Sequence, residues 1–239
     1  MVSAKVPFGI QYSVVAGSWI NYITPATKTF TAGLVLREVS MEWEFDNKSV
    51  DLGLPSGTKW AKFNIDITQP DGFATSEFEG NYYCSFFSWG NIVGHNPISD
   101  TKFDYDFGNS NTGPYSQTTG SQLTGNIPVN STYDAARAWC GVPWRMPTAT
   151  EFQELIDNCT ITSVENNSKP YHKFTSNING KYIYFPLNGN GMNDDFRAQG
   201  ACWHWGSTLY ENGTYGYCIS NKSVGATWRY YGMPIRPVQ

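Results

Sequence analysis

The sequence predicts an α+β fold, made of two helices and short antiparallel strands and preceded by an N-terminal strand segment. Helix start and stop signals mark two segments in the middle of the chain, residues 132–139 and 148–158. After them, short segments that alternate apolar and polar residues continue to the C-terminus, separated by Asn and Gly turns. Helices followed by a run of short strands are typical of α+β proteins. The 239 residues are enough for a sizeable core.

The first helix is expected within the segment NSTYDAARAWCG. Ser131 or Thr132 can accept a hydrogen bond from the free amides of the first turn, as N-cap residues do. Asp134 then lies in the first turn, and Gly141 ends the helix. These signals predict a helix over residues 132–139.

The second helix is expected within WRMPTATEFQELIDNC. Thr148 and Glu151 have the spacing of a capping box, in which each side chain accepts a hydrogen bond from the other residue's backbone amide. Apolar residues recur three and four positions apart on one face: Phe152, Leu155 and Ile156. The pattern predicts a helix over residues 148–158 that packs this face on a core.

Strands are expected on both sides of the helices. Residues 58–65 alternate apolar and polar side chains, and residues 81–90 (NYYCSFFSWG) are interpreted as a dense aromatic strand that ends at a glycine. Beyond the helices, the strand-like segments are residues 160–168, 171–177 and 181–187. Residues 91–130 hold few large aliphatic side chains and predict a long loop, which in a compact domain is usually functional or held by the fold.

Residues 1–46 differ from the rest of the chain and are interpreted as a separate N-terminal β segment. Three stretches alternate apolar and polar positions: residues 6–17, 19–24 and 29–45. Two roles remain open, a sheet packed onto the main domain or a segment for attachment or oligomerisation. Residues 47–239 form the second predicted domain.

The composition is typical of a recognition protein. Charged residues make up only 15% of the chain and aromatic residues 16%, and the polar remainder is rich in Asn, Ser, Thr and Gly. Tyrosine and tryptophan supply rigid contact area, and Asn and Ser supply adaptable hydrogen bonds. The net charge is −4 and no run of Lys or Arg occurs, which argues against a nucleic-acid partner. Residues 1–19 do not form a convincing signal peptide, so we expect either that the protein is not exported by the general route or that the sequence is already processed. No apolar run is long enough to insert into a membrane.

The sequence holds no pattern typical of catalysis or of transition-metal binding. The three histidines stand far apart, the five cysteines show no CxxC spacing, and no nucleophile motif occurs. We therefore expect no enzyme activity and no cofactor. The cysteines are interpreted as buried free thiols, with pairing of Cys202 and Cys218 across a hairpin as the alternative. Asp194 and Asp195 offer oxygen ligands of the kind Ca²⁺ prefers, but a solvated turn explains them better.

Six separated segments resemble one protein family. They are VDLGLPSGTKWA (50–61), CSFFSWG (84–90), WRMPTATEFQELIDNCT (144–160), KYIYFPLNGNG (181–191), HWGST (204–208) and GMPIRPV (232–238). In this order they resemble the major paralogous domain first described in Fibrobacter and common in gut Bacteroidetes and their phages. The resemblance covers residues 47–239 and implies a C-type lectin-like fold. It also implies structural roles for a set of motif residues: Trp144, Arg145, Pro147, Trp205, Arg236 and Val238.

Many members of that family are variable proteins of diversity-generating retroelements, whose C-terminal residues are rewritten on a solvent-facing patch. The resemblance implies that residues 201–239 combine scaffold and display. Because neighbours in a strand point to opposite faces, an inward Trp205 predicts an outward His204. Tyr230 and Tyr231 cannot share a face of a regular strand, so one of them is expected to be partly in the core. The predicted ligand-binding residues are Arg197, Trp203, His204, Tyr210, Asn212, Tyr215, Tyr217, Trp228, Tyr230 and Tyr231.

Three functions follow from these observations, in decreasing order of support. The first is a receptor-binding protein of a phage or prophage, located in the virion tail, which recognises a bacterial surface protein or glycan and attaches or oligomerises through residues 1–46. The second is a secreted or surface adhesin-like module of a gut bacterium. The third is an oxidase of the sulfatase-modifying type, which shares the C-type lectin-like fold. That third function requires a paired redox-active cysteine site, and the cysteines here have no such setting.

Overall fold

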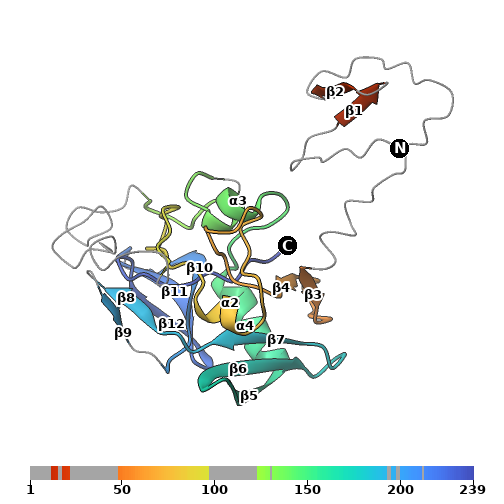
Figure 1. Cartoon of the computed structure of the whole chain (residues 1–239). Coiled ribbons are helices and arrows are strands. Elements are labelled where there is room, and N and C mark those ends of the chain that lie inside the picture. The colour runs from red at the N-terminus through yellow and green to blue at the C-terminus, as the bar shows by residue number, and fades with distance from the viewer. Residues whose placement is uncertain are drawn as a thin grey trace. The chain divides into compact units, whose positions relative to one another are not determined.

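The protein is described by a computed structural model over residues 12–15, 18–21, 48–96, 123–129, 131–192, 195–197, 200–211 and 213–239 (Figure 1). The chain splits into two compact units, Met1–Asn47 and Lys48–Gln239. In the first unit, β1 (Tyr12–Val15) and β2 (Ser18–Asn21) form an antiparallel hairpin. The strand expected over residues 29–45 lies outside the described residues, as does most of the loop expected over residues 91–130.

The second unit combines short helices with small antiparallel sheets. Its elements, in chain order, are β3 (Ser49–Asp51), β4 (Lys59–Ala61), α2 (Glu79–Tyr82), α3 (Ala135–Cys140), α4 (Ala149–Asn158), β5 (Cys159–Asn166), β6 (Lys169–Ser176), β7 (Tyr182–Pro186), β8 (Asn190–Met192), β9 (Asp195–Arg197), β10 (Trp203–Leu209), β11 (Tyr215–Ser220) and β12 (Ser223–Trp228). The strands pair as β3-β4, β5-β6-β7, β8-β9 and β10-β11-β12, and every pairing is antiparallel. The α+β class with antiparallel sheets is thereby confirmed.

Helix α4 begins where its sequence signal predicts. The Thr148 hydroxyl accepts from the Glu151 amide at 3.2 Å, and the Glu151 carboxylate accepts from the Thr148 amide at 2.8 Å, so the capping box is present. Phe152 and Leu155 are fully buried. Figure 1 shows α4 between the β5-β6-β7 and β10-β11-β12 sheets, and it contacts strands of both.

The core gathers around the buried face of α4. Trp60 of β4 packs on Phe152 with ring centroids 5.6 Å apart, and Phe174 packs on Phe185 at 4.9 Å. The last residues of the chain close this core from another side, because Val238 forms isolated bridges with both Trp60 and Arg145. One helix thus brings three sheets and the C-terminus into a single apolar cluster.

Helix α3 begins later than predicted, at Ala135, and its N-cap is Asp134. The Asp134 carboxylate accepts from the Arg137 amide at 3.1 Å and from the Met146 amide at 3.2 Å. Ser131, which the sequence offered as a cap, instead accepts from the Tyr133 amide two residues on. Asp134 replaces the predicted cap because its carboxylate accepts hydrogen bonds both from the first turn of the helix and from the WRMP segment.

The prediction of an aromatic strand over residues 81–90 is wrong. Residues 79–82 form the short helix α2, and residues 86 and 87 pair only through isolated bridges, to His95 and Met233. The side chain of Asn81 explains the helical turn, since it accepts from the Asn64 amide at 2.7 Å and donates to the Glu77 carbonyl at 2.9 Å. These polar contacts override the strand preference of the neighbouring aromatic residues.

The scaffold residues predicted to be buried are buried: Trp144, Trp205 and Arg236 are each fully inaccessible to solvent. The Trp205 indole donates to the Phe87 carbonyl at 2.9 Å and to the Tyr231 carbonyl at 3.2 Å. Trp205 therefore fixes the C-terminal segment to the middle of the chain.

Arg236 is a buried cation whose partners are mostly backbone carbonyls. Its guanidinium donates to the Asn64 side chain at 2.7 Å, the Ala61 carbonyl at 3.0 Å and the Tyr184 carbonyl at 2.6 Å. It lies 4.9 Å from the centre of the Phe185 ring. Burial lowers the pKa of Arg236 to about 9. The role is structural, because these donors join three segments that are far apart in sequence.

Candidate binding surface on the C-terminal sheet

The β10-β11-β12 sheet has two chemically different ends. The pairing of β11 with β12 places Tyr215 opposite Trp228 at one end and Ser220 opposite Ser223 at the other. The first end is aromatic, and the second is the polar turn of the hairpin. The two ends therefore offer different ligand chemistry.

At the first end, six aromatic side chains form one continuous row in which each ring contacts the next. We call this the aromatic row: Tyr217, Tyr210, Tyr215, Trp228, Tyr230 and Tyr231. The successive ring centroids are 5.3, 5.9, 4.5, 6.0 and 5.0 Å apart. Aromatic pairs at such distances stabilise one another beyond the area they bury. The row is therefore a preformed surface rather than a set of independent side chains.

Five rings of the row are half-buried, and Tyr230 is buried with 6% exposure. Burial raises the pKa of Tyr230 to about 12. The expectation that one of Tyr230 and Tyr231 belongs partly to the core is confirmed, and the core residue is Tyr230. This ring anchors the row to the fold, while its neighbours keep part of their faces open.

The back of the row is supported by Trp89. A Cβ atom at Gly216 would lie 2.5 Å from Trp89 Cδ1, so only glycine lets the indole approach β11 this closely. The Trp89 indole also donates to the Gly206 carbonyl of β10 at 2.8 Å. Since neighbours in β11 point to opposite faces, the indole beneath Gly216 leaves Tyr215 and Tyr217 on the other face.

Arg229 ties the loop beside the row to this support. Its guanidinium lies 5.0 Å from the centre of the Trp89 ring and donates to the carbonyls of Leu123 and Gly213, both at 3.0 Å. Burial lowers the pKa of Arg229. Arg229 therefore has a structural role, and it lies outside the set of predicted ligand-binding residues.

The prediction that His204 is exposed is wrong. His204 is fully buried, with its ring 4.7 Å from the Phe185 ring and its Nδ1 3.6 Å from Cys202 Sγ. Burial holds the pKa of His204 well below its usual value. The strand is regularly paired at this point, His204 with Ile219 and Trp205 with Cys218. The two side chains therefore point to opposite faces of the sheet, as predicted. The error arises because both faces of the sheet are covered at this point, so an outward position is still interior.

Of the three remaining predicted residues, only Trp203 has a described side chain, and it lies outside the row. Trp203 is half-buried and pairs with Ser220, at the opposite end of the sheet. Arg197 lies in β9, opposite Asn190, and its side chain is outside the described part of the structure, as is all of Asn212. The candidate Ca²⁺ ligands have the same status: Asp194 and the side chain of Asp195 are not described.

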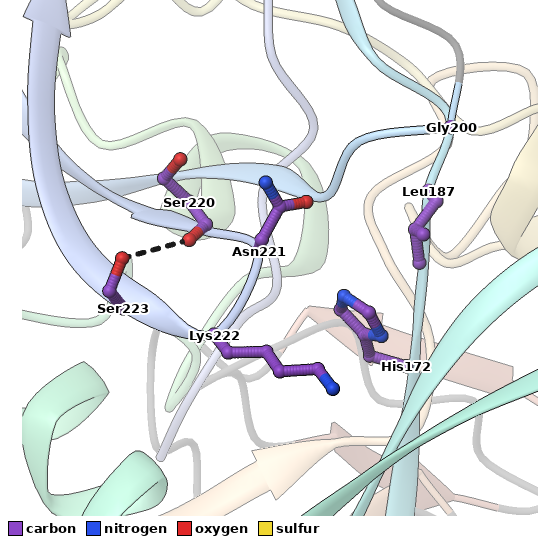
Figure 2. A pocket seen from close by; sticks show the side chains of 7 residues that line it. All are labelled: His172, Leu187, Gly200, Ser220, Asn221, Lys222 and Ser223. Carbon is purple, nitrogen blue, oxygen red and sulfur yellow. Dashed lines mark hydrogen bonds between the residues drawn. The ribbon is translucent and has the colours of Figure 1, made fainter.

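At the second end lies a pocket of about 620 Å³ that the sequence did not predict (Figure 2). Seven residues line it: His172, Leu187, Gly200, Ser220, Asn221, Lys222 and Ser223. They come from β6, the segment after β7, the segment before β10 and the β11-β12 turn. Asn221 adopts the left-handed conformation with φ 53°. Because asparagine tolerates this conformation, the sequence could have indicated the tight turn. Nothing in the sequence indicates that His172 and Leu187 face that turn.

The described residues offer no recognisable catalytic centre. All five cysteines are free and buried, and burial raises the pKa of Cys84 to about 12 and that of Cys159 to about 11. Within the described ranges, no group of three His, Cys, Asp or Glu side chains is placed to hold a metal ion. Nor does this part of the chain contain a helix long and apolar enough to cross a membrane.

Comparison with known proteins gave no match to a family model, to a curated protein or to a solved structure.

Proposed function

We propose that this chain is a receptor-binding protein and that it uses the aromatic row to hold a molecule on a bacterial surface. In this proposal, residues 47–239 have a C-type lectin-like fold of the Fibrobacter type. The chain is a variable protein of a diversity-generating retroelement, carried in the tail of a phage or prophage. The six-segment sequence resemblance supports the family, and the row supports the binding role.

The observation that carries the proposal is the contiguity of the row. A tyrosine or tryptophan gives a large contact area with few rotatable bonds, so ordering it on binding costs little entropy. In the row, contacts with the next ring already restrict each side chain, and Trp89 supports the sheet from behind. Well-packed aromatic side chains that keep part of their surface open supply much of the binding energy in protein interfaces.

The rigid support also suits a surface whose residues vary. Tyr210 and Tyr215 belong to the row through ring contacts, whereas the backbone beneath them is held by Trp89 and Arg229. Replacing a display residue leaves those support contacts in place. A surface of this design can change its ligand without changing its fold.

The proposal is tested by attachment of fluorescently labelled protein to a panel of gut Bacteroidetes strains. The test variant changes Tyr210, Tyr215 and Trp228 to alanine, and circular dichroism at the assay temperature checks that it is folded. We expect the unchanged protein to attach to particular strains and the variant to lose this attachment.

A matched control removes exposed aromatic rings from elsewhere on the same unit. Trp139 and Tyr182 are 37% and 42% exposed and lie outside the row. The variant Trp139→Ala/Tyr182→Ala should attach as the unchanged protein does. If both variants lost attachment equally, binding would depend on exposed aromatic side chains anywhere on the unit, and the role of the row would be refuted.

A further inference from the structure

The pocket at the hairpin turn is separate from the aromatic row. The two ends of β11 lie five residues apart, from Tyr215 to Ser220. At about 3.3 Å per residue in a strand, this separates them by roughly 17 Å. A ligand in the pocket is therefore distinct from one held by the row, and binding in the pocket does not depend on the function proposed for the row.

The turn supplies polar groups on one side of the pocket. Asn221 Oδ1 accepts from the Cys202 amide at 2.9 Å, which fixes the side chain and leaves its NH₂ group as a donor. Ser223 Oγ donates to the Ser220 carbonyl at 3.1 Å, and this bond stabilises the tight turn (Figure 2). Polar groups held in a defined geometry are what give a small-molecule site its specificity.

The charge in the pocket is positive. Lys222 is exposed and lines the pocket, and none of the lining residues is Asp or Glu. Among the described residues, no carboxylate forms an ion pair with it. Figure 2 shows the side chain of Lys222 extending toward His172, which comes from β6. The pKa of His172 is lowered by burial and by the charge of Lys222, so the two groups are electrostatically coupled across the pocket.

The other side of the pocket is formed by an aliphatic side chain, an imidazole ring and a glycine. Leu187 is buried with 8% exposure, His172 with 5%, and Gly200 contributes no side chain. His172 Nδ1 lies 3.4 Å from Ser163 Oγ, which fixes the ring as a wall. The pocket, of about 620 Å³, is largely open to solvent, so a molecule bound there keeps one face exposed.

We propose that this pocket binds a small organic oxyanion, a carboxylate or a phosphate carried on a polar body about the size of a hexose. Lys222 pairs with the oxyanion, the amide of Asn221 donates to it, and the His172 and Leu187 walls contact the less polar face of the body. A cation together with neutral donors, and no acidic group among the lining residues, selects an anion over a neutral molecule.

The proposal is tested by titrating the full chain with methyl β-D-glucuronide and with glucose 6-phosphate, with methyl β-D-glucoside as the uncharged probe. Calorimetry gives the affinity, and the imidazole proton signals of His172 in NMR spectra report occupancy of the pocket. We expect at least one anionic probe to shift those signals, and the glucoside to bind at least about tenfold more weakly. Loss of a charge-assisted hydrogen bond has an effect of this size.

Variants at exposed lysines separate the pocket from general electrostatics. Lys222→Gln should weaken binding of the anionic probe at least about tenfold, and Lys222→Arg should largely retain it. Lys181 is also exposed but does not line the pocket, so Lys181→Gln should bind normally.

The variant lacking Tyr210, Tyr215 and Trp228 should bind the anionic probes normally while losing cell attachment, which distinguishes failure of one site from failure of the other. Absence of binding by both anionic probes would overturn the proposal. So would equal affinities of Lys222→Gln and the unchanged protein.

Discussion

Acid should weaken the fold through Glu151, the carboxylate at the start of α4. Its oxygens accept from Arg145 at 2.8 and 2.5 Å, from the Thr148 amide at 2.8 Å and from the Thr58 hydroxyl at 2.8 Å. Protonation removes the charge that these donors stabilise. The perturbation is therefore a drop in pH, compared between the unchanged protein and Glu151→Gln.

The size of the effect follows from the pKa of Glu151. Burial acts to raise this pKa, but the hydrogen bonds from Arg145, Thr148 and Thr58 outweigh it and lower the pKa from 4.5 to about 2. One pH unit between those values corresponds to about 1.4 kcal/mol, so the ionised carboxylate contributes roughly 3 kcal/mol to the free energy of unfolding.

The pH range follows from the same values. Because the pKa is lower in the folded protein than in the unfolded chain, the contribution is complete above about pH 4.5 and is lost as the pH falls toward 2. Stability should therefore decline with acid across this window, with most of the Glu151 contribution gone by about pH 2.5.

Urea unfolding at about pH 5.5 and about pH 2.5 measures this contribution. The stability difference between the unchanged protein and Glu151→Gln should shrink by roughly 2–3 kcal/mol between the two conditions. Glu154 lies one turn further on the same helix and bonds Ser56 at the surface, so Glu154→Gln controls for general acid effects. If the difference for Glu151→Gln does not change with pH, the reasoning about this carboxylate is wrong.

Three further predictions concern the core and the support of the row. Trp205→Ala should cost about 3–5 kcal/mol and impair folding, measured by thermal unfolding; an unchanged midpoint would contradict its scaffold role. Gly216→Ala should cost about 1–3 kcal/mol because its Cβ meets Trp89, whereas Gly125→Ala, which meets no atom within 4 Å, should cost less than about 1 kcal/mol. The five buried cysteines should not react with a thiol reagent at neutral pH until the protein is unfolded, and fast labelling of the native protein would refute their burial.

The sequence predicted those elements that are determined by residues close together in the chain. The capping box of Thr148 and Glu151 fixed the start of α4, and strands β5, β6 and β7 follow their alternating sequences. The start of α3 and the helix α2 were missed because Asp134 and Asn81 bond groups distant in sequence. Such contacts exist only once the chain is folded.

The candidate site was predictable in part. Alternation correctly separated the inward Trp205 from the opposite face of β10, but it carries no information on what covers that face, and His204 is buried by Phe185. The pocket could not be predicted, because His172 and Lys222 lie 50 residues apart in the chain and meet through sheet packing. The contiguity of the row likewise depends on the pairing register of Tyr215 with Trp228.

The affinity of the Tyr210→Ala/Tyr215→Ala/Trp228→Ala variant for a bacterial strain that the unchanged protein binds tests the central claim most directly. Loss of one aromatic anchor typically costs about 2 kcal/mol or more, so we expect the apparent Kd to rise at least about thirtyfold. The Trp139→Ala/Tyr182→Ala control should keep the original Kd. A folded row variant that binds the strain with unchanged Kd would contradict the claim that the aromatic row is the binding surface.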